Sequence, residues 1–542
     1  MDFHRRDYYV FFSFLGMVQL LYRDTWNAGF VTDFTGLLWR LEGSDALGIL
    51  DSFGFPALQP VLNAFLFIFY KAWGLNPLPW YLVFTSLHAL NGFLAYRFGA
   101  ALLETYSARA PRLIAFLGAL FFLLSPYQSE VVTWRVCFNF LLSSFLVLSV
   151  LWQALAWAKQ GRRRQLWAAH SLFALALFTF ELALAVPLAC LALLLLFPPT
   201  QRSSGGLARQ LQWLSIPQFS MLIAYFVLNR LILGAWVGHY GPAVHLKFRL
   251  GEILANYYRF GFKFLAFNRY WPHPWKEGLS GWLQEPALLY PLALFTVLGL
   301  LFALARFSRW RGEGKASLLF LLLFIFALAP AINLYFNYLL YIENDRYGYL
   351  ASAFFFLGLS SLLSLLPRWL YLSLSIGFII LSTLFLWRTN QYWKQSTALY
   401  YRLMDSFDWY DAPAVYLLNL PDNYQGAVLF RDFSGQGEAF RDALKYIKGK
   451  PYEGAIYEVA QYNLATPTDG ISVRRDSALH YTVEFNQWGN WWWRRGIGMG
   501  PGYDADTYSV ESKGHFYHLT LDSIQPGAVL LYQEKGEWRE VE

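Results

Sequence analysis

Long runs of apolar residues recur through the first 400 residues of this chain. A helix that crosses a lipid bilayer needs about 20 apolar residues, and runs near that length lie at 8–22, 78–101, 112–126, 135–157, 166–180, 182–198, 211–233, 286–306, 316–334, 348–366 and 369–388. Hydrophobic residues make up 56% of the chain and charged residues only 15%, which excludes soluble, disordered and collagen-like proteins. The sequence therefore predicts an α-helical polytopic membrane protein with about 11 spans.

Lysine and arginine residues between these runs indicate the orientation, because cytoplasmic loops carry an excess of both. The basic tracts all fall on one face of the predicted topology: Arg5 and Arg6, Arg109 and Arg112, residues 159–164, Arg202 and Arg209, residues 306–315, and Arg368. The N-terminus is thus expected in the cytoplasm, and the loops 23–77, 125–135, 238–285 and 335–347 outside. We expect the apolar stretch 59–73 to lie in the interface, because a span there would reverse every later basic loop.

The chain changes character after residue 400. Residues 401–542 carry 13 Lys and Arg against 20 Asp and Glu, whereas residues 1–400 carry 30 against 16. Alternating stretches at 481–485 and 516–521 predict strands, and residues 437–447 predict a helix. We expect a small extracytoplasmic α+β domain at 401–542. Its compact size and the lack of repeats favour a bacterial cytoplasmic (inner) membrane.

Composition also excludes two classes of partner. The net charge of +7 could suggest nucleic acid, but the excess basic residues lie in short loops between apolar runs, where a membrane protein carries them. Cys137 and Cys190 fall inside apolar runs, so neither a disulfide framework nor a thiolate metal site is expected.

Ionisable residues gather at the outer ends of the predicted spans, where they are functional candidates. Asp33 follows the first span, Glu130 lies in the turn 125–135, and Asp345 with Arg346 lies in a late outer loop. A carboxylate can act as general base toward a hydroxyl group, and the planar guanidinium of arginine can hold a phosphate through two hydrogen bonds. Together these groups suit transfer of a sugar from a lipid phosphate.

Several stretches, in order along residues 8–405, resemble a known family. They are residues 60–77 (PVLNAFLFIFYKAWGLNP), 87–96 (LHALNGFLAY), 125–132 (SPYQSEVV), 181–187 (ELALAVP), 329–333 (APAIN) with 345–347 (DRY), and 393–400 (WKQSTALY). This pattern resembles the membrane part of the transmembrane tetratricopeptide-repeat O-mannosyltransferases and their bacterial relatives.

The resemblance implies a GT-C fold, that is, a multi-span glycosyltransferase that uses a polyprenyl-phosphate sugar, normally with inversion. By position it implies that Asp33 is the catalytic carboxylate, Glu130 the acid of the second outer loop, and Arg346 the arginine that meets the donor phosphate. The chain departs from the family at Thr32, at Gln59 and in the residue before Glu181. Its tail is unrelated to the family's repeats, so the acceptor, a protein or a glycan, is left open.

Each of these three residues also has a structural interpretation. Asp33 could cap a helix predicted at 34–41, and Glu130 could cap the span that follows it. Arg346 could pair with Asp345 or Glu343.

Further candidates carry the same two kinds of interpretation. Lys263 and Arg269 could frame the lipid head group or belong to an interfacial aromatic belt. Glu181 is a cavity residue or a packing partner, and His88 is more often an interhelical hydrogen-bonding group than a ligand. Asp345 and Tyr347 flank Arg346 in the predicted cavity. A cluster of aromatic and basic residues lies in the tail: Trp488, Trp491, Trp492 and Trp493, followed by Arg494 and Arg495. These residues could contact sugar, anchor the tail to the membrane or fill the core of the C-terminal domain.

The predicted function is therefore an integral-membrane glycosyltransferase that moves a sugar from a polyprenyl-phosphate donor to an acceptor hydroxyl at the outer face. A divalent cation, Mg²⁺ or Mn²⁺, would fit between Asp33, Glu130 and the donor phosphate, although no spacing of His, Glu or Cys indicates a metal site. One alternative is a catalytically inactive GT-C-like structural or binding subunit of a membrane complex. A transporter is less favoured, because the acids lie at one face and not at the midplane.

Overall fold

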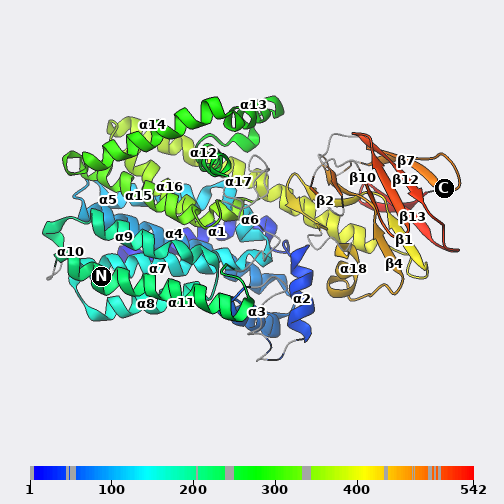
Figure 1. Ribbon diagram of the computed structural model, residues 1–542, viewed down its shortest axis with the longest axis horizontal. Coiled ribbons are helices and arrows are strands. Elements are labelled where there is room, and N and C mark those ends of the chain that lie inside the picture. The colour runs from blue at the N-terminus through cyan, green and yellow to red at the C-terminus, as the bar shows by residue number, and fades with distance from the viewer. Residues whose placement is uncertain are drawn as a thin grey trace.

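The computed structural model consists of a helical body followed by a β-rich C-terminal domain (Figure 1). It describes residues 5–43, 45, 48, 57–202, 206–237, 249–332, 344–431, 438–464, 466, 468, 470–485, 491–493, 496–497 and 502–541. Glu343, Trp488, Arg494 and Arg495 of the sequence predictions lie outside these residues. Among the helices described, one continuous helix joins the two parts.

The helical body spans residues 5–405. Its helices are α1 (Arg5–Leu21), α2 (Asp33–Gly43), α3 (Pro60–Trp73), α4 (Pro77–Thr105), α5 (Pro111–Leu124), α6 (Ser129–Thr133), α7 (Phe138–Gln160), α8 (Arg163–Leu177), α9 (Val186–Leu196), α10 (Gly206–Gln210), α11 (Ile216–Leu233), α12 (Leu250–Ala266), α13 (His273–Gln284), α14 (Pro286–Ala305), α15 (Gly312–Leu328), α16 (Tyr349–Leu363) and α17 (Arg368–Asp405). Short 3₁₀ turns join several of them, notably η3 (Pro126–Gln128), η4 (Arg135–Cys137), η5 (Glu181–Ala185), η8 (Asn268–Tyr270) and η10 (Asp345–Gly348).

Within the described residues, most of each apolar run lies on one helix, in chain order α1, α4, α5, α7, α8, α9, α11, α14, α15, α16 and α17. Four helical stretches among the described residues are long and apolar enough to cross a membrane: 135–160, 206–233, 286–305 and 368–405. A fifth forms if 111–124 and 126–133, bent by 56° at their junction, count as one. The remaining helices are shorter or more polar, so the number of spans stays a prediction.

The predicted basic loops lie together at one end of the helical body. The backbone N–H of Arg109 donates to the Glu313 carboxylate at 2.8 Å, which joins the α4–α5 and α14–α15 loops. The Gln201 amide donates to the Thr105 carbonyl at 2.9 Å, and the Gln210 amide to the Ala158 carbonyl at 3.1 Å. This end includes α10 and points away from the C-terminal domain (Figure 1).

The described residues of the C-terminal domain form three sheets. Their strand orders are β14-β13-β1-β4, β10-β11-β12-β7-β6 and β3-β2-β5-β8-β9. The strands are β1 (Ala414–Leu417), β2 (Leu420–Tyr424), β3 (Ala427–Val428), β4 (Ala455–Glu458), β5 (Gln461–Leu464), β6 (Ile471–Arg475), β7 (His480–Phe485), β8 (Trp491–Trp493), β9 (Gly496–Ile497), β10 (Gly502–Asp504), β11 (Tyr508–Ser512), β12 (Phe516–Leu521), β13 (Val529–Glu534) and β14 (Glu537–Glu540). The strands predicted at 481–485 and 516–521 are confirmed as β7 and β12. The predicted helix is α18 (Ala439–Asp442), continued by a π-helical turn, η11 (Ala443–Ile447).

Helix α17 attaches this domain to the helical body. Its 38 residues extend for about 57 Å at 1.5 Å per residue, well beyond the predicted end at residue 388. The Ser396 hydroxyl donates to the Ala427 and Val428 carbonyls at 3.1 Å, and the Trp538 indole N–H donates to the Leu403 carbonyl at 2.9 Å. The domain boundary expected at residue 400 thus lies inside a helix whose last turns pack against the sheets.

Candidate functional site

The loop that leads to Asp33 is held against the turn that carries Glu130. Gly29 has φ +93°, and a Cβ atom there would overlap the carbonyl oxygen of Thr133. The Arg135 backbone N–H donates to the Gly29 carbonyl at 3.1 Å, and the Trp134 indole donates to the Val31 carbonyl at 3.2 Å. Only glycine fits such an approach, so the loop between α1 and α2 and the turn that carries Glu130 form one unit.

Gly29→Ala is therefore expected to destabilise the fold. The methyl group would meet backbone, which yields little, and the positive φ adds strain; together these are expected to cost more than about 2 kcal/mol. Thermal unfolding in detergent measures the loss. Gly36→Ala is the matched control, because a Cβ atom at Gly36 would meet nothing within 4 Å. Equal stability of the two variants would contradict the close approach.

Arg135 was not identified as a candidate from the sequence, yet its side chain stabilises the loop that leads to Asp33. Its side chain is fully buried and donates to the carbonyls of Thr25 at 3.4 Å and Trp26 at 3.2 Å. Its guanidinium also lies 5.0 Å from the centroid of the Phe84 ring. An arginine at the mouth of an apolar run is the only signal that the sequence offers for this role.

Asp33 begins α2, whose bounds confirm the helix expected at 34–41, and its side chain is exposed. Its carboxylate shares a neighbourhood with two other candidates. The charges of Asp33, Glu130 and Arg346 all act on one buried thiol, that of Cys137 in η4. The structure therefore brings these three residues to the same end of the helical body.

Glu130 and Arg346 form a buried ion pair. The Arg346 guanidinium approaches the Glu130 carboxylate at 2.5 Å, and the Arg346 backbone N–H donates to its other oxygen at 2.8 Å. Glu130 is 4% exposed and Arg346 14% exposed. The guanidinium also lies over the rings of Trp134 and Tyr347, at 5.3 and 4.8 Å from their centroids. Arg346 thus pairs with an acid 216 residues away and not with its neighbour Asp345.

Asp345 belongs to a second buried charge cluster with Lys263 and Arg269. Lys263 donates to its carboxylate at 2.6 Å, and Arg269 pairs with the other oxygen. All three side chains are at most 5% exposed. Burial lowers the pKa of the Lys263 ammonium group, and Asp345 opposes that change. Burial raises the pKa of the Asp345 carboxyl group, and Arg269 and Lys263 oppose it.

Arg269 keeps unused hydrogen-bond donors. Its Nε and Nη1 atoms are buried and have no hydrogen-bond partner in the part of the chain that the structure describes, and its guanidinium lies 4.6 Å from the centroid of the Tyr127 ring. Buried polar groups are nearly always paired, so such orphans call for an explanation.

The two ion-pair groups adjoin each other, because Asp345 and Arg346 are consecutive in η10. The Glu130 charge also acts on Lys263 and Asp345. With three basic and two acidic side chains in their ordinary charge states, the combined cluster (Glu130, Lys263, Arg269, Asp345, Arg346) has an excess positive charge. Such a cluster can bind an anion.

The remaining predicted residues lie apart from this cluster or beside it. Tyr347 is buried next to Arg346, whose guanidinium donates to its hydroxyl at 3.5 Å. His88 is fully buried and hydrogen-bonds across helices, with Nδ1 2.7 Å from the Tyr349 hydroxyl. Glu181 begins η5 and accepts a hydrogen bond from Gln59 at 3.4 Å. Gln59 and Glu181, 122 residues apart in the sequence, thus contact each other in the structure.

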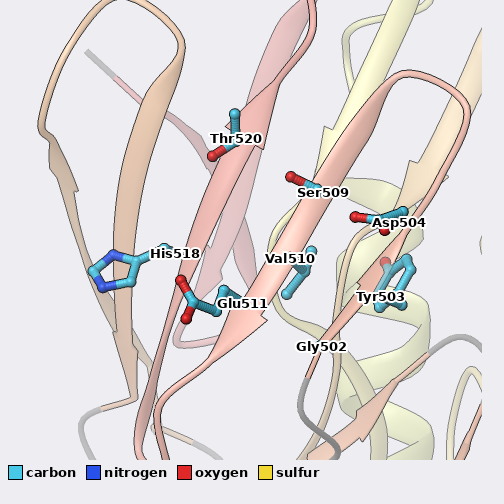
Figure 2. A pocket seen from close by; sticks show the side chains of 8 residues that line it. All are labelled: Gly502, Tyr503, Asp504, Ser509, Val510, Glu511, His518 and Thr520. Atoms are coloured by element: carbon cyan, nitrogen blue, oxygen red, sulfur yellow. The ribbon is translucent and has the colours of Figure 1, made fainter.

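Two cavities elsewhere do not include Asp33, Glu130 or Arg346. One of about 430 Å³ lies among α12, α13 and α14 and is lined in part by Asn256 and Arg259. The other, of about 330 Å³, lies on the sheet β10-β11-β12 and carries Asp504 and Glu511 (Figure 2). Among the described residues, no group of three or more His, Cys, Asp or Glu side chains could hold a metal ion. A cation between two acids and a donor phosphate stays a prediction.

No family model, curated protein or solved structure matches this chain. The resemblance to the O-mannosyltransferases therefore stays a prediction that is based on the motifs alone.

Proposed function

We propose that this protein is an integral-membrane glycosyltransferase of the GT-C type. It transfers a sugar, with inversion, from a polyprenyl-phosphate donor to the hydroxyl group of a protein or glycan acceptor at the outer face of the cytoplasmic membrane. The observation that carries this proposal is the buried cluster of Lys263, Arg269 and Arg346, which adjoins the loop of Asp33 at the end opposite the basic loops.

A phosphate group fits the cluster for a physical reason. The buried guanidinium of Arg269 has two N–H groups with no acceptor among the described residues, and a buried donor is stabilised when it finds an acceptor. A donor phosphate would accept from those groups and balance the excess charge. Arginine suits this role because its planar fork matches phosphate oxygens.

The acids would then divide the chemistry. Asp33, exposed at the start of α2, takes the acceptor proton as the hydroxyl oxygen attacks the anomeric carbon. The bond from that carbon to the phosphate oxygen breaks, and the departing phosphate keeps the electron pair, stabilised by Arg346 and Arg269. The Glu130 carboxylate holds Arg346 in place, because it accepts hydrogen bonds from both the backbone N–H and the guanidinium of Arg346.

The outer surface of the helical body supports a place in a bilayer. Helix α14 exposes large apolar side chains, among them Phe295 at 73% and Leu294 at 58%, and water does not favour such a surface. The basic loops gather at the end away from the C-terminal domain, and by the positive-inside rule this supports our proposal that the domain lies outside the cytoplasm. Eleven spans would follow from the eleven helices named above.

Transfer in proteoliposomes tests the proposal. We expect the purified protein to move labelled sugar from a polyprenyl-phosphate sugar, supplied from a panel of sugars, to acceptors in membrane extract, without any nucleotide sugar. Arg346→Gln should lower the rate at least about 100-fold, since it removes a group that stabilises the leaving phosphate. Arg162→Gln, in an exposed basic loop, is the control. Wild-type turnover by Arg346→Gln would contradict the assigned role.

The Glu130–Arg346 ion pair favours a second candidate, a catalytically inactive structural or binding subunit of a membrane complex. In that case the pair is a structural link between the second outer loop and η10, and no phosphate displaces it. Purification at fixed stoichiometry in a larger complex, together with failure to transfer any sugar of the panel, would select this candidate.

A further inference from the structure

The residue before Asp33 has an unusual backbone conformation. Thr32 has φ +48°, the left-handed region, which a β-branched residue rarely adopts. Such a conformation persists only where the surroundings hold it, and it is found preferentially at functional sites. Thr32 is 4% exposed, so its surroundings and not solvent determine its geometry.

The group that holds Thr32 comes from the C-terminal domain. The Thr32 hydroxyl donates a hydrogen bond to the carbonyl oxygen of Arg431, 399 residues further along the chain. On the other side, the backbone N–H and the hydroxyl of Thr35 both donate to the Thr32 carbonyl at 2.9 Å. The turn that starts α2 is thus fixed from both sides.

Arg431 is itself firmly anchored in the domain. Its guanidinium donates to both oxygens of Asp422 in β2, with Nε at 2.7 Å, and both side chains are at most 5% exposed. The two residues before Arg431 are hydrogen-bonded to β2. The Leu429 backbone N–H donates to the Asp422 carbonyl at 2.8 Å, and the Phe430 backbone N–H donates to the Pro421 carbonyl at 3.2 Å. The carbonyl that receives Thr32 is therefore part of the domain's sheet framework.

Helix α2 also contacts the domain. It packs on α18 and η11, and Figure 1 shows α18 beside it. The charge of Glu42, near the end of α2, acts on Lys445 in η11. The helix that begins with Asp33 thus rests between the helical body and the C-terminal domain.

We propose that the C-terminal domain positions the catalytic base, with Thr32 and Arg431 as the contact that does so. This inference rests on the proposed function in assigning the base role to Asp33. The domain holds a strained turn in the one conformation that aims Asp33, and so acts as part of the catalytic framework and not only as an appendage. Thr32 and Arg431 are positioning residues, since neither touches the reacting atoms.

Thr32→Val and Thr32→Ser test this contact. Valine keeps the shape but removes the donor, whereas serine keeps the donor. For Thr32→Val we expect kcat to fall about tenfold or more with an unchanged KM for the donor, because small misplacement of a catalytic group slows chemistry more than binding. We also expect amide exchange at residues 29–38 to become about tenfold faster. For Thr32→Ser we expect the wild-type kcat and the wild-type exchange rate at residues 29–38.

Two further variants complete the test. Asp422→Asn, which loosens Arg431 from within the domain, should change kcat and exchange in the same direction. Thr105→Val is the control, because the Thr105 hydroxyl is equally buried and bonds only within its own helix, to Ala101 at 2.7 Å. It should leave kcat and the exchange at 29–38 unchanged.

The exchange measurement separates this inference from the proposed function. If wild-type protein transfers sugar and Thr32→Val matches it in kcat and in exchange, the positioning role is wrong. If wild-type protein transfers no sugar but Thr32→Val still loosens residues 29–38, the contact stands and the assignment of a transfer reaction is wrong.

Discussion

Asp33→Asn is expected to abolish sugar transfer without unfolding the protein. The amide has the shape of the carboxylate but cannot take a proton, and loss of a general base lowers the rate by about 10²–10⁴-fold. Because Asp33 is exposed, the substitution does not change a buried carboxylate. Initial rates from a polyprenyl-phosphate sugar, with melting temperature measured in parallel, test both parts of this expectation.

Asp24→Asn is the matched control for that variant. Asp24 lies in the same loop between α1 and α2, where it accepts from Gln391 at 2.8 Å and pairs with Lys394 at 3.6 Å. We expect it to retain transfer. Wild-type turnover by Asp33→Asn would show that the base is another residue.

The second large effect is on stability. Asp345→Asn leaves Lys263 and Arg269 buried without the carboxylate that pairs with both of them, and breaking a buried pair in this way costs about 3–5 kcal/mol. We expect a clear fall in melting temperature in detergent. Asp476→Asn, which removes an exposed partner of Arg474, should produce no measurable fall.

Equal melting temperatures for these two variants would contradict the buried cluster. Inorganic phosphate or a donor lipid should restore part of the stability of Asp345→Asn, because an added anion replaces the lost carboxylate charge.

The sequence predicted local features well where one pattern determined them. The helix after Asp33 followed from an aspartate before an apolar stretch, and β7 and β12 followed from strict alternation of apolar and polar residues. Helix α17 extends to Asp405, beyond the predicted end at residue 388, because the apolar residues that carried the prediction stop where contact with a bilayer would end. The helix continues because its later residues pack against a domain that is only assembled in three dimensions.

The site shows the same limit. The sequence placed Lys263, Arg269 and Asp345 on one face but could not pair residues 76–82 positions apart. Of the two structural partners considered for Arg346, Asp345 pairs elsewhere, and Glu343 lies outside the described residues. On the 3₁₀ turn η10, consecutive side chains point in directions about 120° apart, so Asp345 reaches the two cations of the α12–η8 segment while Arg346 reaches Glu130. The Thr32–Arg431 contact had no signal in the sequence, because it depends on how two domains meet.

Mass spectrometry of the lipids that stay bound to the purified protein tests the central claim most directly. We expect a polyprenyl-phosphate sugar to co-purify with the wild-type protein and to be strongly depleted from Arg269→Gln, while Arg162→Gln retains it. Retention of bulk phospholipid alone by the wild-type protein, or equal retention of the polyprenyl-phosphate sugar by Arg269→Gln, would contradict the account.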